Sequence, residues 1–248
     1  MNIVNNAKMN HFPSNVKLLS TQRFIEGGKS SNNFANFNLA LHVNDNSNRV
    51  LENRKMLKNL YNLPSEPQWI NQIHSSKCVD AASIDSIIEA DASFTSRAGV
   101  VCAIMTADCL PVFVSKKDGT MVGIAHAGWR GLISGVIENL LKSFNSNGDN
   151  LLVHLGPAIS KKSFEVGDEV RNLFLAKNSN FERSFITKNN KIFLDLYDAA
   201  KVILEGFQIK SISGGDRCTF REPSDFFSYR RDGINSGRMA HLIWMTKD

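Results

Sequence analysis

The sequence has few cysteines and no long apolar run. The longest apolar run near its middle, VVCAIM, is far shorter than the roughly 20 residues that cross a bilayer. The first residues, MNIVNNAKMNHF, lack the apolar core of a secretory signal peptide. The four cysteines lie far apart, so no disulfide framework is expected; they are Cys78, Cys102, Cys109 and Cys218. We therefore expect a cytoplasmic protein with no membrane partner.

The sequence also lacks a strong charge and a basic cluster. Its 29 Lys and Arg residues outnumber 24 Asp and Glu residues, which gives a net charge of +5. The basic residues are scattered, and the nearest approach to a cluster with an aromatic is SYRRDG. Nucleic-acid modules usually concentrate Lys and Arg on one face. We expect no nucleic-acid partner, although a modest positive excess favours small anionic ligands.

No nucleotide-binding motif is present. A GxGxxG fingerprint is missing, so nothing indicates a dinucleotide cofactor. The stretch EGGKSS imitates the end of a phosphate-binding loop, but Arg23 stands where that motif requires its first glycine.

The patterning predicts one domain over residues 1–248, because no repeat and no convincing linker interrupts the chain. Short runs rich in Val, Ile and Phe predict buried strands: VVCAIM, PVFV, MVGIA, LLVHL and RMAHLIWM. Cys102 lies inside the first run and is expected to pack in the core. Asn-rich pieces at 42–49 and 145–150 are typical of loops.

Two helices are predicted between strands. Residues 132–144 carry an apolar stripe at helical spacing and follow the turn GWRG. Residues 191–215 predict a strand, a helix that stops at Gly206, and another strand. This alternation favours an α/β (α+β) sandwich, in which mixed β-sheets are covered by helices.

Three residues are candidate metal ligands: His74, Cys109 and His126. They are separated by 35 and 17 positions, unlike the compact CxxC or HxxxH spacing of many zinc sites. A site built from the ends of separate strands leaves no such spacing. If the three converge, they give zinc three ligands and an open fourth position, as in catalytic sites. The alternative is three unrelated residues that pack or hydrogen-bond separately.

The turn Gly128–Gly131 suggests an anion site. Backbone N–H groups at a helix start favour an anion, so Arg130 and this turn could hold phosphate beside His126. The alternative is a tight turn with Trp129 packed on the sheet. Another reading makes Cys109 a nucleophile and His126 its base, with Asp108 or another acid orienting the imidazole.

The sequence resembles the YfiH family, also called the multicopper polyphenol oxidase or laccase-domain family. The similarity runs from about residue 38 to the end of the chain. It rests on stretches that occur in the family's order: NQIHSSKCVD, ADASFTS, TADCLPVFV, IAHAGWRGL, LGPAIS, FEVGDEV and FFSYRRDGINSGRMAHLIW.

The resemblance implies a single-domain sandwich with zinc bound by His74, Cys109 and His126. It also implies purine nucleosides and phosphate as substrates: phosphorolysis of adenosine, inosine, guanosine and methylthioadenosine, and deamination of adenosine. His42 and Asp45 are candidates for protonating the leaving base, since the similarity begins near them. Arg130, and more weakly Arg230, are candidates for binding phosphate.

A multicopper oxidase is not expected, because six histidines are too few for several histidine-rich copper sites. Copper is expected in the His-Cys-His site only adventitiously. The chain departs from the family at Ser75, where a glycine is usual, and at Lys162-Ser163-Phe164, where a Cys-Tyr pair is frequent. The second departure leaves the substrate preference open.

Two other functions stay open. The fold implied by the resemblance is similar to that of cysteine-dependent toxin deamidases, and some family members are linked to editing peptidoglycan precursors. Cys109 could therefore be the nucleophile of an amide hydrolase. Zinc could instead only stabilise a binding protein. We expect a monomer or a weak homo-oligomer.

Overall fold

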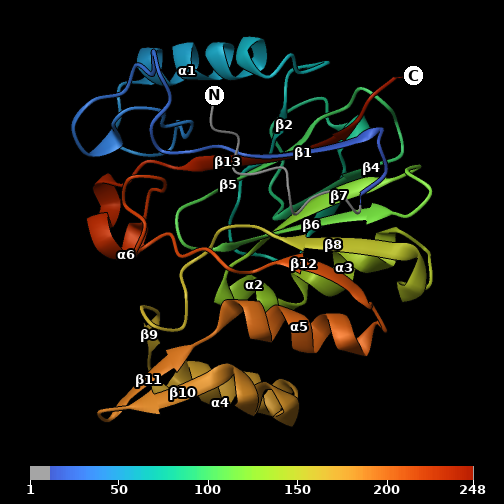
Figure 1. Ribbon diagram of the computed structural model, residues 1–248, viewed down its shortest axis with the longest axis vertical. Helices are drawn as coiled ribbons and strands as arrows, with labels where there is room; N and C mark the ends of the chain where they lie inside the picture. The colour runs from blue at the N-terminus through green and yellow to red at the C-terminus, as the bar shows by residue number, and fades with distance from the viewer. Residues whose placement is uncertain (1–11, 248) are drawn as a thin grey trace.

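The structure is a computed structural model that describes residues 12–247, and its elements form stacked layers (Figure 1). A four-stranded and a six-stranded sheet pack face to face. Helix α1 (Ser47–Leu60) covers the outer face of the first sheet. Helices α2 (Trp129–Ser134), α3 (Val136–Ser143) and α5 (Leu196–Gly206) cover the outer face of the second. The predicted sandwich of mixed sheets and covering helices is confirmed.

The four-stranded sheet has the order β1-β13-β5-β2. β13 runs antiparallel to both β1 and β5, whereas β2 runs parallel to β5. The strands span Val16–Ser20 (β1), Gln68–Trp69 (β2), Cys102–Thr106 (β5) and Met239–Met245 (β13).

The six-stranded sheet has the order β12-β8-β6-β7-β4-β3. β6 and β7 are its antiparallel centre, and parallel pairs lie at both edges. The strands span Cys78–Asp80 (β3), Ala92–Thr95 (β4), Leu110–Lys116 (β6), Val122–Ala127 (β7), Leu151–Leu155 (β8) and Ser211–Gly214 (β12). The predicted strands are confirmed as β5, β6, β7, β8 and β13.

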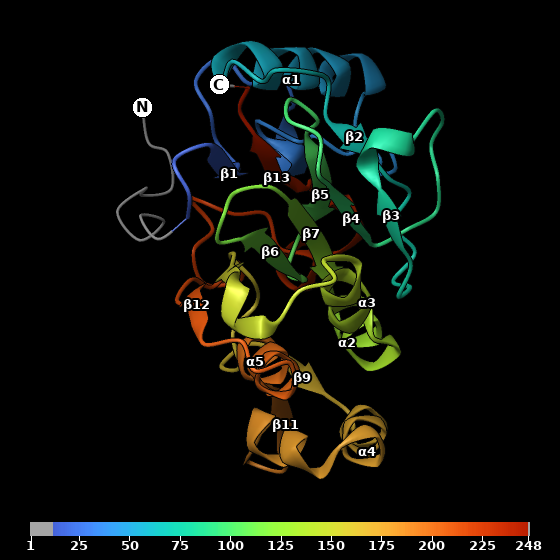
Figure 2. The ribbon, with the colours of Figure 1, turned by 90° about the vertical axis from the view of Figure 1, so that its right-hand side faces the viewer.

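A three-stranded sheet with α4 (Asp168–Lys177) lies at the end of the molecule farthest from α1 (Figure 2). Its order is β10-β11-β9, with bounds Phe185–Lys188, Lys191–Leu194 and Glu165–Val166. A short helix, α6 (Tyr229–Asp232), precedes β13. Among residues 12–247, no helix has the length and apolar character needed to cross a bilayer.

Apolar side chains fill the space between the two larger sheets and between each sheet and its helices. Ile104, Phe113 and Ile124 are fully buried between the sheets. Cys102 is buried in the same layer, which confirms its predicted place in the core. The all-apolar runs are thus strands buried on both faces.

Two local predictions were wrong. The stripe over 132–144 is not one helix, because Gly135 takes a left-handed conformation with φ +93° and separates α2 from α3. α2 also begins at Trp129, inside the GWRG turn. The Asn-rich stretch 42–49 is only partly a loop, since α1 begins at Ser47. Asn46 caps this helix by accepting the backbone N–H groups of Asn48 and Arg49.

Candidate metal centre

Three side chains from different parts of the chain converge beside the six-stranded sheet. His74 lies between β2 and β3, Cys109 in the turn between β5 and β6, and His126 on β7. Because β6 pairs with β7 and places Pro111 opposite His126, the Cys109 turn lies beside this histidine. Their ligand atoms lie within 4.8 Å of one another, and Cys109 Sγ is 3.8 Å from His74 Nε2. The structure brings together the three predicted ligands.

The buried carboxylate of Asp91 holds the ring of His126 and the backbone at His74. His126 Nδ1 lies 2.8 Å from Asp91 Oδ1. The same carboxylate accepts three successive backbone N–H groups, from Ile73, His74 and Ser75. Burial alone would raise the pKa of Asp91, but hydrogen bonds from His126 and Ser75 lower it to about 2. An ionised carboxylate only accepts, so Nδ1 of His126 carries the proton and Nε2 faces the site.

Asp108 is not the acid that orients His126, and the other acid that the nucleophile hypothesis allowed is Asp91. Asp108 has a left-handed backbone conformation with φ +95°. It accepts hydrogen bonds from the hydroxyls of Thr219 (2.6 Å) and Ser228 (3.0 Å) and from the backbone N–H of Arg230 (2.6 Å). Asp108 therefore ties the Cys109 turn to the segment before β13.

Gly128 permits the close approach of the ligands. A Cβ atom there would lie 2.8 Å from Cys109 Sγ and 3.1 Å from Cδ2 of His74. Both distances are too short for ordinary van der Waals contact. Any larger residue at 128 would move a ligand.

Cys109 and His126 shift each other's pKa in opposite directions. Burial would raise the pKa of the Cys109 thiol, but His126 and His74 lower it below its ordinary value. Burial would lower the pKa of His126, but Cys109 and Asp91 raise it above its ordinary value. The site therefore favours a thiolate, which is the form of cysteine that binds metal.

The two candidate phosphate ligands lie on the rim of the site. Arg130 is exposed at the start of α2, and its guanidinium lies 4.3 Å from the ring centroid of Trp129. Within residues 12–247 it forms no ion pair. Arg230 stacks over Phe164 at 5.2 Å and donates one N–H to the carbonyl of Glu165. Arg130 is therefore the freer of the two cations.

His42 and Asp45 lie in the loop before α1. The His42 side chain reaches solvent. Partial desolvation and the charges of Arg238 and Arg54 nevertheless lower its pKa. Asp45 Oδ2 accepts hydrogen bonds from Ser30 and Asn38, at 2.6 and 2.9 Å, which favours a structural role for this carboxylate.

Sequence reasoning missed Asp91, Arg54 and Arg238. Burial lowers the pKa of Arg54 to about 10, and its guanidinium lies 4.2 Å from the Trp69 ring centroid. Burial also lowers the pKa of Arg238, while Cys109 and Asp108 act in the opposite direction, so this arginine lies near the site. Asp91 and Arg238 stand inside two of the stretches that carry the family resemblance, but no local spacing rule marks them.

The cavity beside the ligands has a volume of about 50 Å³. That is room for an ion and water, so a nucleoside would have to extend across the outer surface. Two of the residues that depart from the family pattern lie here: Phe164 lines the cavity, and the Ser75 hydroxyl donates to Asp91 at 2.8 Å. Other walls are formed by Trp129, Arg130, Ile159 and Leu196.

The sandwich fold and the converging His, Cys and His define the class of protein. The family described as multi-copper polyphenol oxidoreductase laccase matches residues 18–246. The chain belongs to this family.

Its relatives carry a more specific name. The chain is 44% identical to the purine nucleoside phosphorylase YfiH of Escherichia coli over 234 residues, which cover 94% of this chain and 95% of the relative. It is 39% identical to a purine nucleoside phosphorylase of Haemophilus influenzae over 235 residues, with coverage of 94% and 95%.

Solved structures show the same fold. A Neisseria meningitidis protein superposes with a TM-score of 0.90 and 41% identity, over 95% of this chain and 96% of that chain. YlmD from Geobacillus stearothermophilus has a TM-score of 0.86 and 27% identity, over 94% and 93%.

The donor set fits a single metal ion. Two imidazoles and one thiolate suit zinc, and the Asp91 bond fixes the tautomer of one imidazole. Two further histidines are used elsewhere: His241 bonds the hydroxyls of Ser20 and Thr106, and His154 bonds that of Ser213. The described residues therefore hold one His-Cys-His group and not the several copper sites of a multicopper oxidase.

Proposed function

We propose that the protein is a zinc-dependent purine nucleoside phosphorylase acting on adenosine, inosine, guanosine and methylthioadenosine, with adenosine deaminase activity at the same site. The observation that carries this proposal is the convergence of His74, Cys109 and His126 beside Arg130. The names of the relatives supply the substrate class. Copper is an adventitious occupant of the same ligands.

The ligand geometry supports a catalytic ion. Three protein donors leave a coordination position for substrate or solvent. A bound zinc ion would supply Lewis acidity for a substrate oxygen or for an attacking water. Because Asp91 bonds Nδ1 of His126, the Nε2 atom stays available to coordinate the metal ion. Gly128 leaves room for Cys109 Sγ to lie beside His74.

In phosphorolysis a phosphate oxygen forms a bond to C1′ of the ribose while the bond from C1′ to the purine nitrogen breaks. Arg130 is proposed to hold the phosphate, because its guanidinium is free of ion pairs in the described chain and borders the metal cavity. Arg230 is proposed as a second phosphate contact. Both cations would also offset charge that develops on the attacking anion.

The departing purine takes up a proton or a hydrogen bond. His42 is the better of the two candidates, since the Asp45 carboxylate already holds Ser30 and Asn38. The lowered pKa of His42 makes it a neutral imidazole near pH 7, which can donate one N–H to a base nitrogen. We therefore propose that His42 hydrogen-bonds the leaving base.

The test measures metal content and adenosine turnover together, in wild type, Cys109→Ala and the control Cys78→Ala, whose thiol lies outside the site. Reactions run with and without phosphate, and chromatography resolves adenine, inosine and hypoxanthine. Adenine that forms only with phosphate, and only in proteins that retain zinc, supports phosphorolysis. Zinc-loaded wild type without nucleoside turnover overturns it.

Arg130→Gln tests the phosphate site separately. We expect KM for phosphate to rise about ten-fold or more with unchanged zinc content, because one charged contact to the anion is lost. Arg171→Gln on α4 is a matched control, since Arg171 pairs with Glu182 outside the site. Equal KM values for phosphate in the two variants would show that Arg130 does not bind phosphate.

A second function is favoured by one observation, which is that Asp91, His126 and Cys109 are arranged in the manner of an acid, base and nucleophile. In that case the protein would hydrolyse amides such as those of peptidoglycan precursors. A chelator separates the two: it abolishes turnover by a zinc enzyme and preserves turnover by a free Cys109 nucleophile. A zinc-stabilised binding protein would instead unfold when zinc is removed.

A further inference from the structure

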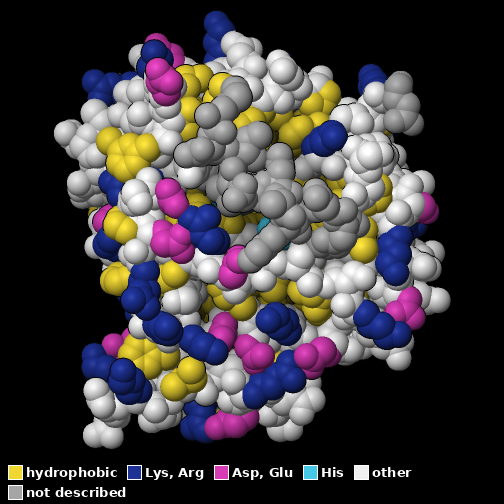
Figure 3. All heavy atoms as spheres, viewed as in Figure 1, with side chains coloured by type: hydrophobic (Ala, Val, Ile, Leu, Met, Phe, Trp, Pro, Cys, Tyr) yellow, Lys and Arg dark blue, Asp and Glu magenta, His cyan; other side chains and the backbone are white. Residues whose placement is uncertain are grey.

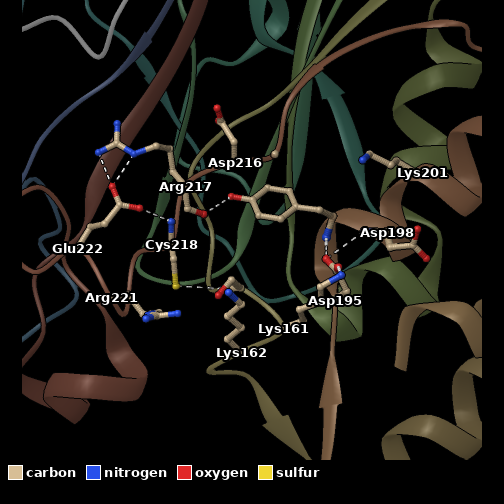
Figure 4. A pocket seen from close by; sticks show the side chains of 13 residues that line it. Lys161, Lys162, Asp195, Asp198, Lys201, Asp216, Arg217, Cys218, Arg221 and Glu222 are labelled. Atoms are coloured by element: carbon tan, nitrogen blue, oxygen red, sulfur yellow. Dashed lines mark hydrogen bonds and ion pairs between the residues drawn. The ribbon is translucent and has the colours of Figure 1, made fainter. Parts of the chain in front are cut away.

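Two cavities adjoin each other beside the three-stranded sheet, away from the metal centre. Their volumes are about 590 and 550 Å³, in the range of small-molecule sites. Both are lined by Lys161, Lys162 and Arg221. We call the joined cavities the basic groove. Figure 4 shows the first cavity, with Lys162 and Arg221 on the same side of it and Lys201 at a distance from them.

The junction of the groove has more positive than negative charge. Lys161 is neutralised by Asp195 at 3.1 Å, and Lys191 by Glu165 at 2.8 Å. Within residues 12–247, Lys162, Lys188 and Arg221 form no ion pair. No carboxylate lines the second cavity. Four acids line the first cavity. Asp195 pairs with Lys161, Asp198 with Arg183 and Glu222 with Arg217, and the fourth is Asp216.

An apolar wall lies beside these cations. Ile186 on β10 is 41% exposed, and Phe193 on β11 lines the same cavity. On the face seen in Figure 3, Lys and Arg side chains border hydrophobic ones over the region that β10 and β11 occupy in Figure 1. A flat apolar surface next to free cations is complementary to a molecule with an aromatic ring and several phosphates.

The basic groove is separate from the metal centre, although both use the same segments. Ile159 and Phe164 line the metal cavity, whereas Ser160, Lys161 and Lys162 between them line the groove. The same alternation recurs at α5, where Leu196 lines the metal cavity and Tyr197 the groove. A ligand in the groove would therefore contact the back of the wall that encloses the metal centre.

We propose that the basic groove binds a nucleoside di- or triphosphate. The phosphates lie between Lys162 and Arg221, where the planar guanidinium can bond two phosphate oxygens. The base packs on Ile186 and Phe193. This assignment is independent of the reaction at the metal centre.

The experiment is calorimetric titration of the whole protein with ATP, inorganic tripolyphosphate and adenosine. Lys162→Ala/Arg221→Ala removes two groove cations. Lys117→Ala/Lys142→Ala is the matched control, since it removes the same charge from exposed positions elsewhere. We expect the groove variant to weaken ATP and tripolyphosphate binding about ten-fold or more, and the control to weaken it less than two-fold. If ATP binding weakens equally in the groove variant and the control variant, the phosphates respond only to the net charge of the protein, and the proposal is overturned.

Two further variants locate the ligand. Arg130→Gln tests the metal centre, and an ATP affinity that falls as much as in the groove variant would place ATP there and overturn the proposal. Ile186→Ala tests the apolar wall. We expect it to weaken ATP several-fold and to leave tripolyphosphate unchanged. An equal effect on both probes would show that the base does not bind at the wall and would overturn the proposal. Adenosine, which is proposed to bind at the metal centre, should bind the groove variant as it binds wild type, and a loss of its affinity there would overturn the separation of the two sites.

Discussion

The metal centre and the basic groove lie on opposite sides of residues 159–164 and hold their polar groups in different ways. At the metal centre Asp91 and Asp108 are buried, and each accepts several hydrogen bonds from different segments. In the groove, Lys162 and Arg221 are exposed and, within the described chain, without an ion pair. The first region is pre-organised for a ligand that needs fixed geometry. The second is suited to a ligand that supplies the missing charge.

The largest effect should follow from Cys109→Ala. Two imidazoles without the thiolate hold zinc poorly, so we expect zinc content to fall from about one per chain to near zero and kcat/KM for adenosine to fall by at least about 1000-fold. Far-ultraviolet circular dichroism should stay unchanged, because Cys109 is only partly buried. If Cys109→Ala keeps its zinc, the metal centre is not organised around the ion, and its contrast with the basic groove fails.

Asp91→Asn should come next. The amide cannot accept all the hydrogen bonds of the carboxylate, so the His126 ring and the backbone at His74 are held less firmly. We expect zinc affinity to fall about 10- to 100-fold and the free energy of unfolding to fall by about 1–3 kcal/mol. Chelator competition and urea unfolding measure the two. Asp118→Asn, at an exposed carboxylate bonded to Thr120, is the control and should change neither.

His241 is a further buried polar residue whose hydrogen bonds are fixed in the fold. Its ring bonds the hydroxyls of Ser20 and Thr106. Burial, with a smaller effect of His126, lowers the pKa of His241 from 6.5 to about 3. Between these values the unfolded chain takes up a proton that the folded chain does not, so stability falls as the pH falls below 6.5. From pH 7.5 to pH 5 the loss should be about 2 kcal/mol.

Urea unfolding of wild type and His241→Gln at both pH values measures that loss. Glutamine does not titrate, so the variant should lose about 2 kcal/mol less than wild type between the two pH values. Equal pH dependence in the two proteins would show that His241 does not stay neutral in the fold.

The smallest effect is expected in the groove. Lys162→Ala/Arg221→Ala should change the free energy of unfolding by no more than about 0.5 kcal/mol, because both side chains are exposed. Zinc content and adenosine turnover should equal those of wild type. A turnover that falls with this variant would erase the distinction between the two regions and make the groove part of the active site.

The sequence predicted those elements of the fold that a short apolar pattern within one segment reveals. The strands β5, β6, β7, β8 and β13 follow from short apolar runs between turn residues. The break at Gly135 was missed because the residues on either side stay buried: Leu132, Val136, Ile137 and Leu140 continue the same stripe whether or not the helix is interrupted. A single glycine lowers helix propensity but does not dictate a positive φ.

The site was less predictable because its supports come from pairing between distant strands. Asp108 was one choice to orient His126, since it neighbours Cys109, but its carboxylate is held instead by hydrogen bonds from Thr219 and Ser228. Asp91 reaches His126 because β4 pairs with β7 and places Ala92 opposite Ala125. The groove shows the same effect: Lys162, Lys188 and Arg221 are far apart in sequence, so no basic cluster is visible there.

The position of β13 determines when during synthesis the molecule can be completed. β13 lies between β1 and β5, and Ser20 bonds His241 across 221 residues. A ribosome therefore releases β1 long before the strand that pairs with it. The partners of Asp108, Thr219 and Ser228, also emerge after all three metal ligands. A nascent chain thus carries His74, Cys109 and His126 before the partners that hold Asp108 exist, so the candidate metal site is completed only in the last stage of folding.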